Sequence, residues 1–231
     1  MRFRFLSFFI AALIACSPSK NIQKETWEIL FDGADVSKLR GYQLPGFPSS
    51  AWEVKDNALV AKTGVANVDL LTKNEYKNFE LSFDWKTSIG GNSGVFFHVR
   101  EDEKQEAGNG NSPNWLTNYE MQLLDDVNFY DKEPKRSAGA LYDLITPQNK
   151  TLRPVGEYNT SRLVVQDNKV EHWLNGTKVV EYTMDSPELN SLISKSKFKD
   201  IPSFGKSRTG HIAFQHHGQE FWFRNIRVRA L

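Results

Sequence analysis

Two segments of the chain place chemically active side chains at alternate positions, as on one face of a β-strand. In "GGNSGVFFHVR", which starts at residue 90, the alternation puts His98 and Arg100 on the same face as Phe96. In "NYEMQLLDD", which starts at residue 118, Glu120 and Gln122 lie on one face and apolar residues on the other. An imidazole can accept a proton near neutral pH, and a guanidinium can stabilise an anion. The two segments therefore predict a polar surface that could carry out proton transfer.

Two further segments extend this polar set. "HIAFQHHG" directs Gln215 and His217 away from its apolar residues, and "GALYDLI" contains Tyr142. If these strands share one sheet, its solvent side gathers the following side chains around a shallow groove: His98, Arg100, Glu120, Gln122, Tyr142, Gln215 and His217. Carboxylate, amide and imidazole groups can bind sugar hydroxyls, and Trp173 or Trp222 could supply a ring for the C–H face of the sugar.

Several of these residues also have structural explanations. Glu120 and its strand neighbours could form an ordinary solvated face, and Asn92, after a Gly-Gly pair, could shape a turn or line the groove. A lone histidine on a strand is more often a surface or hydrogen-bonded side chain than a base. His216 faces away from His217, so the two cannot readily chelate one metal unless the strand ends there, which Gly218 would permit.

The segments that must position these residues read as β almost throughout. Short apolar or alternating runs are separated by turn signals, of which Asp56-Asn57, Asp167-Asn168 and Asn175-Gly176 predict two-residue hairpins. One helix is predicted over Pro187–Lys195, with Ser186 as its N-cap. Long rim loops are expected at residues 101–118, 126–137 and 185–209. About a dozen strands and one short helix predict an all-β fold with two packed antiparallel sheets, a jelly-roll sandwich.

Length and composition limit the number of domains and the kinds of binding partner. The chain of 231 residues is long enough for one well-buried domain. Lys plus Arg is 29 and Asp plus Glu is 28, a net charge of +1, so the chain has no nucleic-acid footprint. Aromatic residues make up 13% of the chain, a surplus that suits a core or a sugar-binding surface.

The first 26 residues are not expected to join this fold. Arg2 and Arg4 precede an apolar run that is too short to span a bilayer and is typical of a secretory signal. The run ends in "LIAC", which resembles a bacterial lipobox with Cys16 as the lipidated residue, and an ordinary cleaved signal is the alternative. Residues 1–16 are therefore predicted to be a lipoprotein signal peptide, 17–26 a flexible tether and 27–231 the folded domain. Because Cys16 is the only cysteine, this exported, lipid-anchored domain would have no disulfide.

Eight segments, in order and over nearly all of the predicted domain, carry a family resemblance. They are "LFDGADVSKLRGY", "AWEVKDNALVAK", "LLTKNEYKNFELSFDWK", "GGNSGVFFHV", "NYEMQLLDD", "AGALYDLI", "RPVGEYNTSRLVVQDNKVEHWLNGTKVVEY" and "GHIAFQHHGQEFWFRNIRVRAL". The chain resembles the bacterial 3-keto-disaccharide hydrolase domain family. It departs from the family pattern at Tyr158, where Trp is common, and at His216, where Asp is common.

The resemblance implies a concanavalin-like (LamG-like) jelly roll and activity on glycosides oxidised at the sugar 3-position. A ketone at C3 acidifies the C2 proton, so a base can form an enolate, the C1 group can leave, and water can complete net hydrolysis. The base would be His217 or His98. Arg100, or a divalent metal ion held partly by Glu120, would stabilise the enolate oxygen, and Tyr142 would donate to that oxygen or to the leaving oxygen. The remaining substrate contacts would come from Gln122, Gln215, Asn92 and Trp173.

A non-catalytic, lectin-like carbohydrate-binding module is the alternative function, because jelly rolls host both classes. The enzymatic function further implies a pathway partner, an oxidoreductase that produces the 3-ketone. Elimination and direct hydrolysis both stay open, and contact with a membrane is expected only through the lipid anchor.

Overall fold

The computed structural model describes residues 26–101 and 117–231. The predicted signal peptide, its Cys16 and nearly all of the predicted tether lie outside the described residues. Within the described ranges, no helix is long and apolar enough to cross a membrane.

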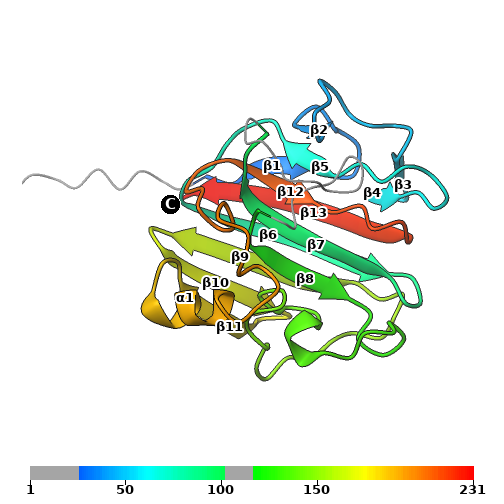
Figure 1. Cartoon of the computed structure of the whole chain (residues 1–231). Coiled ribbons are helices and arrows are strands. Elements are labelled where there is room, and N and C mark those ends of the chain that lie inside the picture. The colour runs from blue at the N-terminus through cyan, green and yellow to red at the C-terminus, as the bar shows by residue number, and fades with distance from the viewer. Residues whose placement is uncertain (1–25, 102–116) are drawn as a thin grey trace, which may run out of the picture.

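Two antiparallel sheets pack against each other, and Figure 1 shows their strands running in roughly the same direction. The larger sheet has eight strands in the order β11-β10-β9-β6-β13-β4-β3, with β1 paired to β13. Its strands are β1 (Glu28–Phe31), β3 (Trp52–Lys55), β4 (Ala58–Ala61), β6 (Phe79–Thr87), β9 (Asn159–Gln166), β10 (Lys169–Leu174), β11 (Thr177–Thr183) and β13 (Phe221–Ala230). The smaller sheet has the order β2-β5-β12-β7-β8. Its strands are β2 (Leu39–Gly41), β5 (Leu70–Thr72), β7 (Asn92–Val99), β8 (Glu120–Leu124) and β12 (His211–Phe214). The predicted all-β sandwich is confirmed.

The hairpin turns lie where the sequence predicts them. Asp56 and Asn57 join β3 to β4 with φ of 50° and 59°, and Asn175 and Gly176 join β10 to β11 with φ of 47° and 85°. These left-handed values at both turn positions match the right-handed twist of the strands and favour Asn, Asp and Gly. The two signals thus fix the register of the two hairpins.

The predicted helix is α1 (Pro187–Ile193), which is two residues shorter than expected. The Ser186 hydroxyl accepts a hydrogen bond from the Leu189 amide at 3.1 Å, as an N-cap does. A 3-10 helix, η2 (Pro134–Arg136), was not predicted.

The prediction of a strand at "GALYDLI" is wrong. In this segment Leu141 makes only isolated bridges, to Met121 and Ile145, and Asp143 has φ of 60°. The segment is hydrogen-bonded to the edge of β8 from Gly139 to Tyr142, and the left-handed residue Asp143 then turns the chain away.

The main core lies between the two sheets and is rich in aromatic side chains. Its fully buried rings include Trp52, Trp85, Phe79, Phe83, Phe97, Phe214, Phe221 and Phe223. Phe83 and Phe214, from opposite sheets, meet edge to face with ring centroids 5.9 Å apart. Burying one such side chain contributes roughly 1.5–3 kcal/mol, which can stabilise the sandwich without a disulfide.

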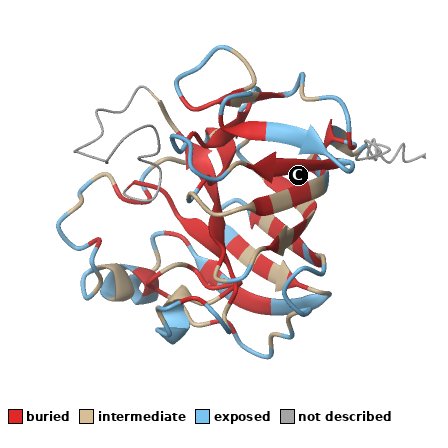
Figure 2. Cartoon of the chain, turned by 90° about the vertical axis from the view of Figure 1, so that its right-hand side faces the viewer, coloured by how far each residue is buried: buried red, intermediate tan, exposed pale blue. Residues whose placement is uncertain are grey.

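A second, smaller apolar cluster lies on the face of the five-stranded sheet that points away from the eight-stranded sheet, called the outer face below. It consists of Tyr42, Leu71, Phe96, Val99 and Ala213. Every residue of β7 and β8 is buried, and Figure 2 shows that the buried segments of the chain gather in the interior while the exposed ones lie mainly in the peripheral loops. The expectation of a solvent-facing side is therefore wrong. Polar side chains on the outer face are buried, which is costly unless other polar groups compensate.

A β-bulge breaks the alternation of β7 near its end. His98 has φ of 56°, and the pairing of β7 with β12 shifts register at this point. Val99, not His98, therefore joins Phe96 in the outer-face cluster. The face predicted for His98 is wrong, because one extra residue reverses the facing of those that follow.

Candidate active site

Glu120 lies on the outer face at the start of β8, which is the edge strand of the five-stranded sheet. It lies opposite Phe96 in the β7–β8 pair, and Gln122 lies opposite Gly94. A Cβ atom added to Gly94 would lie 2.0 Å from Glu120 Oε1, so the carboxyl group fills the space that a side chain at position 94 would take. On the other side of β7, the backbone amide of Gln215 donates to the Gly94 carbonyl at 2.9 Å, so Gln215 lies in the same cross-strand row.

Asp69 is the second carboxylate of this face. It precedes β5 and is fully buried, and its Oδ1 accepts a hydrogen bond from the His216 amide at 2.8 Å. Burial raises the pKa of Glu120 to about 8, with the charge of Asp69 acting in the same direction and that of Lys197 in the opposite one. Glu120 is therefore mostly protonated at neutral pH, and its carboxylate is a stronger base than an ordinary one.

Tyr142 and Lys197 form a pair next to Glu120. The Tyr142 amide donates to the Glu120 carbonyl at 3.1 Å, and Lys197 Nζ donates to the Tyr142 hydroxyl at 2.8 Å. Lys197 Nζ also lies 4.1 Å from the centroid of the Tyr142 ring. Burial, with the nearby charge of Glu120, raises the pKa of Tyr142 well above its usual range. The phenol therefore stays protonated and can donate while it accepts from Lys197.

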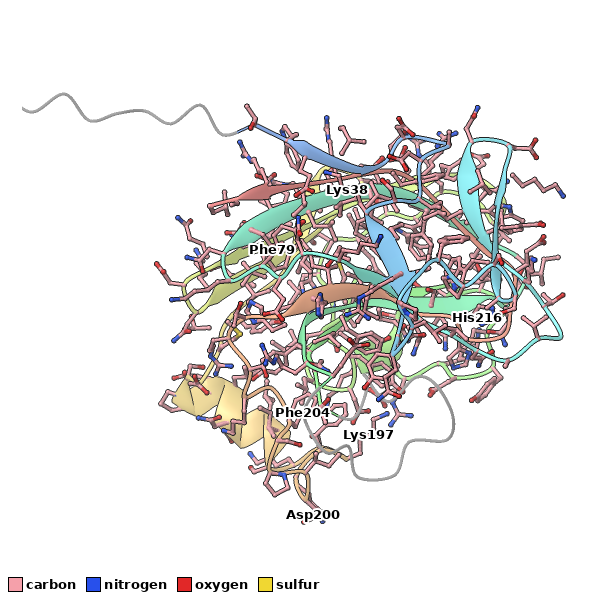
Figure 3. The ribbon with its side chains drawn as sticks, turned by 90° about the horizontal axis from the view of Figure 1, so that it is seen from above. Lys38, Phe79, Lys197, Asp200, Phe204 and His216 are labelled. Carbon is pink, nitrogen blue, oxygen red and sulfur yellow. The ribbon has the colours of Figure 1, made fainter. Side chains whose placement is uncertain are left out.

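The segment between α1 and β12 carries Lys197 to this position. Phe198 and Phe204 stack with centroids 4.0 Å apart, and Phe204 meets Tyr119 edge to face at 5.3 Å. The Gly205 amide donates to the Thr117 carbonyl at 2.8 Å. Figure 3 shows Lys197 and Phe204 on the same side of the molecule, beyond the five-stranded sheet. Although much of the Lys197 side chain is exposed, burial of its ammonium group lowers its pKa, while Asp143 and Glu120 act in the opposite direction.

Five of the predicted site residues share the outer face. Glu120, Gln122, Gln215 and Tyr142 lie around Gly94 as described. Asn92 lies two positions before Gly94 on β7 and is buried. Within the part of the chain that the structure describes, its Oδ1 atom is buried without a hydrogen-bond partner.

The other four predicted residues lie elsewhere. His98 packs edge to face against Phe79 and Phe97 beside the main core, with Nε2 2.8 Å from the Lys77 carbonyl oxygen, and burial lowers its pKa. Arg100 forms an ion pair with Glu75 at 3.2 Å.

His217 is exposed beyond the end of β12, with Nδ1 3.0 Å from Gln219 Oε1. Trp173 belongs to β10 of the eight-stranded sheet, where its ring lies 4.1 Å from the Arg162 guanidinium. His216, which the sequence left open, is buried and packs edge to face against Trp52 at 5.5 Å.

Two site residues were missed from the sequence. Asp69 had a signal, because an acidic residue directly before the apolar run "LL" is out of place unless it has a role. Lys197 had none, because its position depends on how the segment of residues 185–209 packs. Among the described residues, no group of three or more His, Cys, Asp or Glu side chains could hold a metal ion.

Comparison with known proteins identifies the family. The chain matches the model of the 3-keto-alpha-glucoside-1,2-lyase-like domain over residues 26–229. The 3-keto-disaccharide hydrolase of Bacteroides thetaiotaomicron is 33% identical over 226 residues, which cover 87% of this chain and 77% of that protein. A solved structure of a proposed glycosyl hydrolase from Parabacteroides distasonis has a TM-score of 0.80 and 30% identity, over 89% of this chain and 94% of that one.

A more distant likeness concerns the fold alone. A Bacillus subtilis protein with a galectin-like fold has a TM-score of 0.56 and 12% identity, over 88% of this chain and 94% of that one. The predicted jelly-roll class and the predicted enzymatic class are confirmed by these matches. The chain belongs to the family of the 3-keto-alpha-glucoside-1,2-lyase-like domain.

Proposed function

We propose that the chain cleaves glycosides that carry a ketone at C3 of the sugar, with Glu120 as the group that transfers the proton. The name of the Bacteroides thetaiotaomicron relative, 3-keto-disaccharide hydrolase, supports this substrate class. The observation that carries the role of Glu120 is its burial over Gly94 with a pKa raised to about 8. A carboxyl group whose pKa lies near the working pH can accept a proton in one step and return it in the next.

The reaction follows from the acidity that the ketone confers. The Glu120 carboxylate removes the C2 proton, and the electron pair of the C–H bond moves toward the C3 carbonyl to form an enolate. When the enolate collapses, the bond from C1 to the leaving oxygen breaks and a C1–C2 double bond forms. The proton now on Glu120 passes to the leaving oxygen. Release at this stage is a lyase reaction, and addition of water across the double bond gives net hydrolysis.

Lys197 and Tyr142 suit the stabilisation of the enolate. Their ammonium and phenol groups are 2.8 Å apart and lie next to Glu120, where a substrate that offers its C2 proton to Glu120 brings its C3 oxygen close. Donors that are already held in place stabilise a developing oxyanion without reorganising during the reaction. The side-chain amides of Gln122 and Gln215, which lie in the cross-strand row of Gly94, would then bind sugar hydroxyls.

The proposal moves the base from the histidines to a carboxylate. His98 is buried on a different face of β7, and His217 is exposed beyond β12. Glu120 has the raised pKa that proton transfer needs, and its charge interacts with Tyr142 and Lys197. A lectin needs amides and a ring but no carboxyl group of this kind, which favours the enzyme over the binding module.

The test measures aglycone release from a 3-keto-glucoside and from its unoxidised parent, with and without a chelator. Release from the ketone alone is expected, and Glu120→Gln should lower kcat by about 10²–10⁴-fold. Glu80→Gln is the matched control, because Glu80 is also buried but lies on the eight-stranded sheet. Equal release from the parent sugar, or full activity in Glu120→Gln, would contradict the proposal. Saturable sugar binding without any release would favour the lectin-like module, and loss of activity with the chelator would give a metal ion the role assigned to Lys197.

We further propose that the chain is an exported lipoprotein supplied with substrate by a sugar 3-oxidoreductase. Support comes from the signal pattern that ends at Cys16 and from the chemistry, because glycosides carry hydroxyl groups, not ketones, until they are oxidised. Labelling of growing cells with a radioactive fatty acid should mark the wild-type chain and leave Cys16→Ser unmarked. Labelling of both would contradict the role of Cys16.

A further inference from the structure

A hollow of about 490 Å³ lies on the face of the eight-stranded sheet that points away from the five-stranded one. It is on the opposite side of the sandwich from Glu120 and plays no part in the proposed reaction. Its lining includes Ile29, Ser82, Asp84, Thr160, Asn225 and Arg227.

Two β-bulges create this hollow. β1 shifts register against β13 between Ile29 and Phe31, and β13 shifts against β6 between Arg224 and Arg227. Asn225, inside the second bulge, has φ of 52°. Bulges re-aim side chains and frequently lie beside binding sites. An extra residue in each of two neighbouring strands opens the surface at the same place.

A small residue occupies the middle of the hollow. Ser82 lies between Arg162 of β9 and Arg227 of β13 in the cross-strand row, and it is only partly buried. Because the side chain of Ser82 is short and those of Arg162 and Arg227 are long, the protein surface is lower at Ser82 than on either side of it. A ligand can therefore reach down to the sheet between the two arginines.

Asp84 presents a fixed acceptor next to Ser82. Its Oδ1 accepts from the Thr160 hydroxyl at 2.7 Å, and its Oδ2 accepts from the Asn225 amide at 2.7 Å. Each carboxylate oxygen has a further lone pair, so the group can still accept hydrogen bonds from a ligand. A carboxylate, an amide and hydroxyls held in this way match the hydrogen-bonding pattern of a sugar.

Two aromatic rings lie beyond arginines near the hollow, although neither ring lines it. The Trp173 ring lies 4.1 Å from the Arg162 guanidinium, and the Trp27 ring lies 4.7 Å from that of Arg227. Both rings are half-buried. Each arginine covers part of its ring and holds it in place, so an oligosaccharide that extends past the hollow could stack on the rest of the ring at little cost in side-chain entropy. The sequence pattern predicts Trp173 at the sugar site around Glu120. In the structure, Trp173 lies on the eight-stranded sheet instead.

Most charges around the hollow are paired, although four arginines (Arg162, Arg224, Arg227 and Arg229) face three carboxylates (Asp32, Glu80 and Asp84). Glu80 forms ion pairs with Arg162 at 2.9 Å and with Arg229 at 2.5 Å, and Arg224 Nε lies 3.4 Å from Asp84 Oδ2. Because three of the four arginines already lie beside a carboxylate, only a weak field is left to concentrate a phosphate or a polyanion. The occupant that fits it is uncharged.

We propose that this hollow is a second carbohydrate-binding site, which takes a neutral oligosaccharide through Asp84 and Asn225, with Trp27 and Trp173 as outer contacts for its ends. The chain would then hold a glycan on one face and cleave a 3-keto-glycoside on the other. The site stands without the proposed reaction, because none of its residues belongs to the outer face around Glu120.

The test is calorimetric titration of the full chain with maltotetraose, cellotetraose and laminaritetraose. At least one tetrasaccharide should bind, and Glu120→Gln should bind it equally well. Ser82→Tyr, which fills the hollow, and Asp84→Ala, which removes the acceptor, should each weaken binding about tenfold or more. Thr177→Tyr is the matched control, because it adds the same ring at an exposed position of β11 outside the hollow. Ser82→Tyr should also leave the cleavage of a small 3-keto-glucoside unchanged.

Three results would overturn the proposal. They are no binding of any of the three probes, binding that both Ser82→Tyr and Asp84→Ala retain, and binding of an acidic tetragalacturonide in preference to the neutral sugars. Because cleavage is measured on a separate small substrate, a failure here is distinguishable from a failure of the proposed reaction. Agreement between two variants of different chemistry guards against an effect of misfolding in one of them.

Discussion

Glu120→Gln should stabilise the protein while it abolishes proton transfer. The native pKa of Glu120 is about 8, against 4.5 for an unhindered glutamate, so the native state favours the protonated form. The unfolded chain loses this proton as the pH rises above 4.5, and the native chain loses it only near 8. The contribution of Glu120 to the free energy of unfolding is therefore largest below pH 4.5. It falls as the pH rises from 4.5 through about 8, where the native carboxyl group also loses its proton.

The size of this effect follows from the two pKa values. The difference between 4.5 and about 8 corresponds to about 5 kcal/mol above pH 8 and to about 3 kcal/mol at pH 7. Glutamine has nearly the shape of protonated glutamate and does not titrate. The advantage of the variant should therefore be small at pH 5 and grow with pH. At pH 7 it should raise the melting temperature by about 6–12 °C for a domain of this size.

Urea unfolding of both proteins at pH 5, 7 and 9 measures the effect directly. Glu80→Gln is the control of opposite sign: burial acts to raise the pKa of Glu80, but hydrogen bonds from Arg162 and Arg229 outweigh it and hold that pKa below its usual value. Its carboxylate stabilises the protein above pH 4.5, so Glu80→Gln should destabilise at pH 7. If the stability difference between Glu120→Gln and the wild type is the same at pH 5 and pH 9, the burial argument for Glu120 is refuted.

Three further predictions test the site and the core. Gly94→Ala should displace the Glu120 carboxyl group, since the new Cβ would lie 2.0 Å from Oε1, and should lower kcat at least tenfold; an unchanged kcat would show that the carboxyl group need not lie there. Lys197→Met should move the limb of the pH–rate profile that reports Glu120 to higher pH, because the ammonium group lowers the pKa of Glu120; a limb that stays in place would exclude this contact. His172 is fully buried, which lowers its pKa from 6.5 to about 4, so stability should fall by about 3 kcal/mol as the pH drops from 6.5 to 4. His172→Phe should remove this pH dependence, and a variant that retains it would assign acid lability to other groups.

The sandwich was predictable because its signals are local. Each hairpin turn needs left-handed residues, and Asp56, Asn57 and Asn175 supply them in the sequence itself. Alternation likewise separated Glu120 and Gln122 from the core side of β8. Such features depend on neighbours in the chain, so they can be read without the tertiary structure.

The candidate site was only partly predictable because its chemistry depends on distant contacts. The bulge at His98 arises from pairing with β12, so counting positions along β7 assigned the wrong face. The proximity of Lys197 to Glu120 depends on a segment that follows α1 and packs through Phe198 and Phe204. Burial of the outer face, which turns Glu120 from a solvated acid into a group with a raised pKa, is likewise a property of the assembled fold.

Because Glu120 approaches Gly94 so closely, substitutions at these two positions on adjacent strands should be correlated during evolution. An acid can occupy position 120 in this rotamer only while position 94 has no side chain. A descendant that gains a Cβ at position 94 must first lose or move the acid, and with it the proposed reaction. Relatives with a larger residue at position 94 should therefore lack the acid at 120, and the pair can be used to separate catalytic members of the family from those that have kept only the fold.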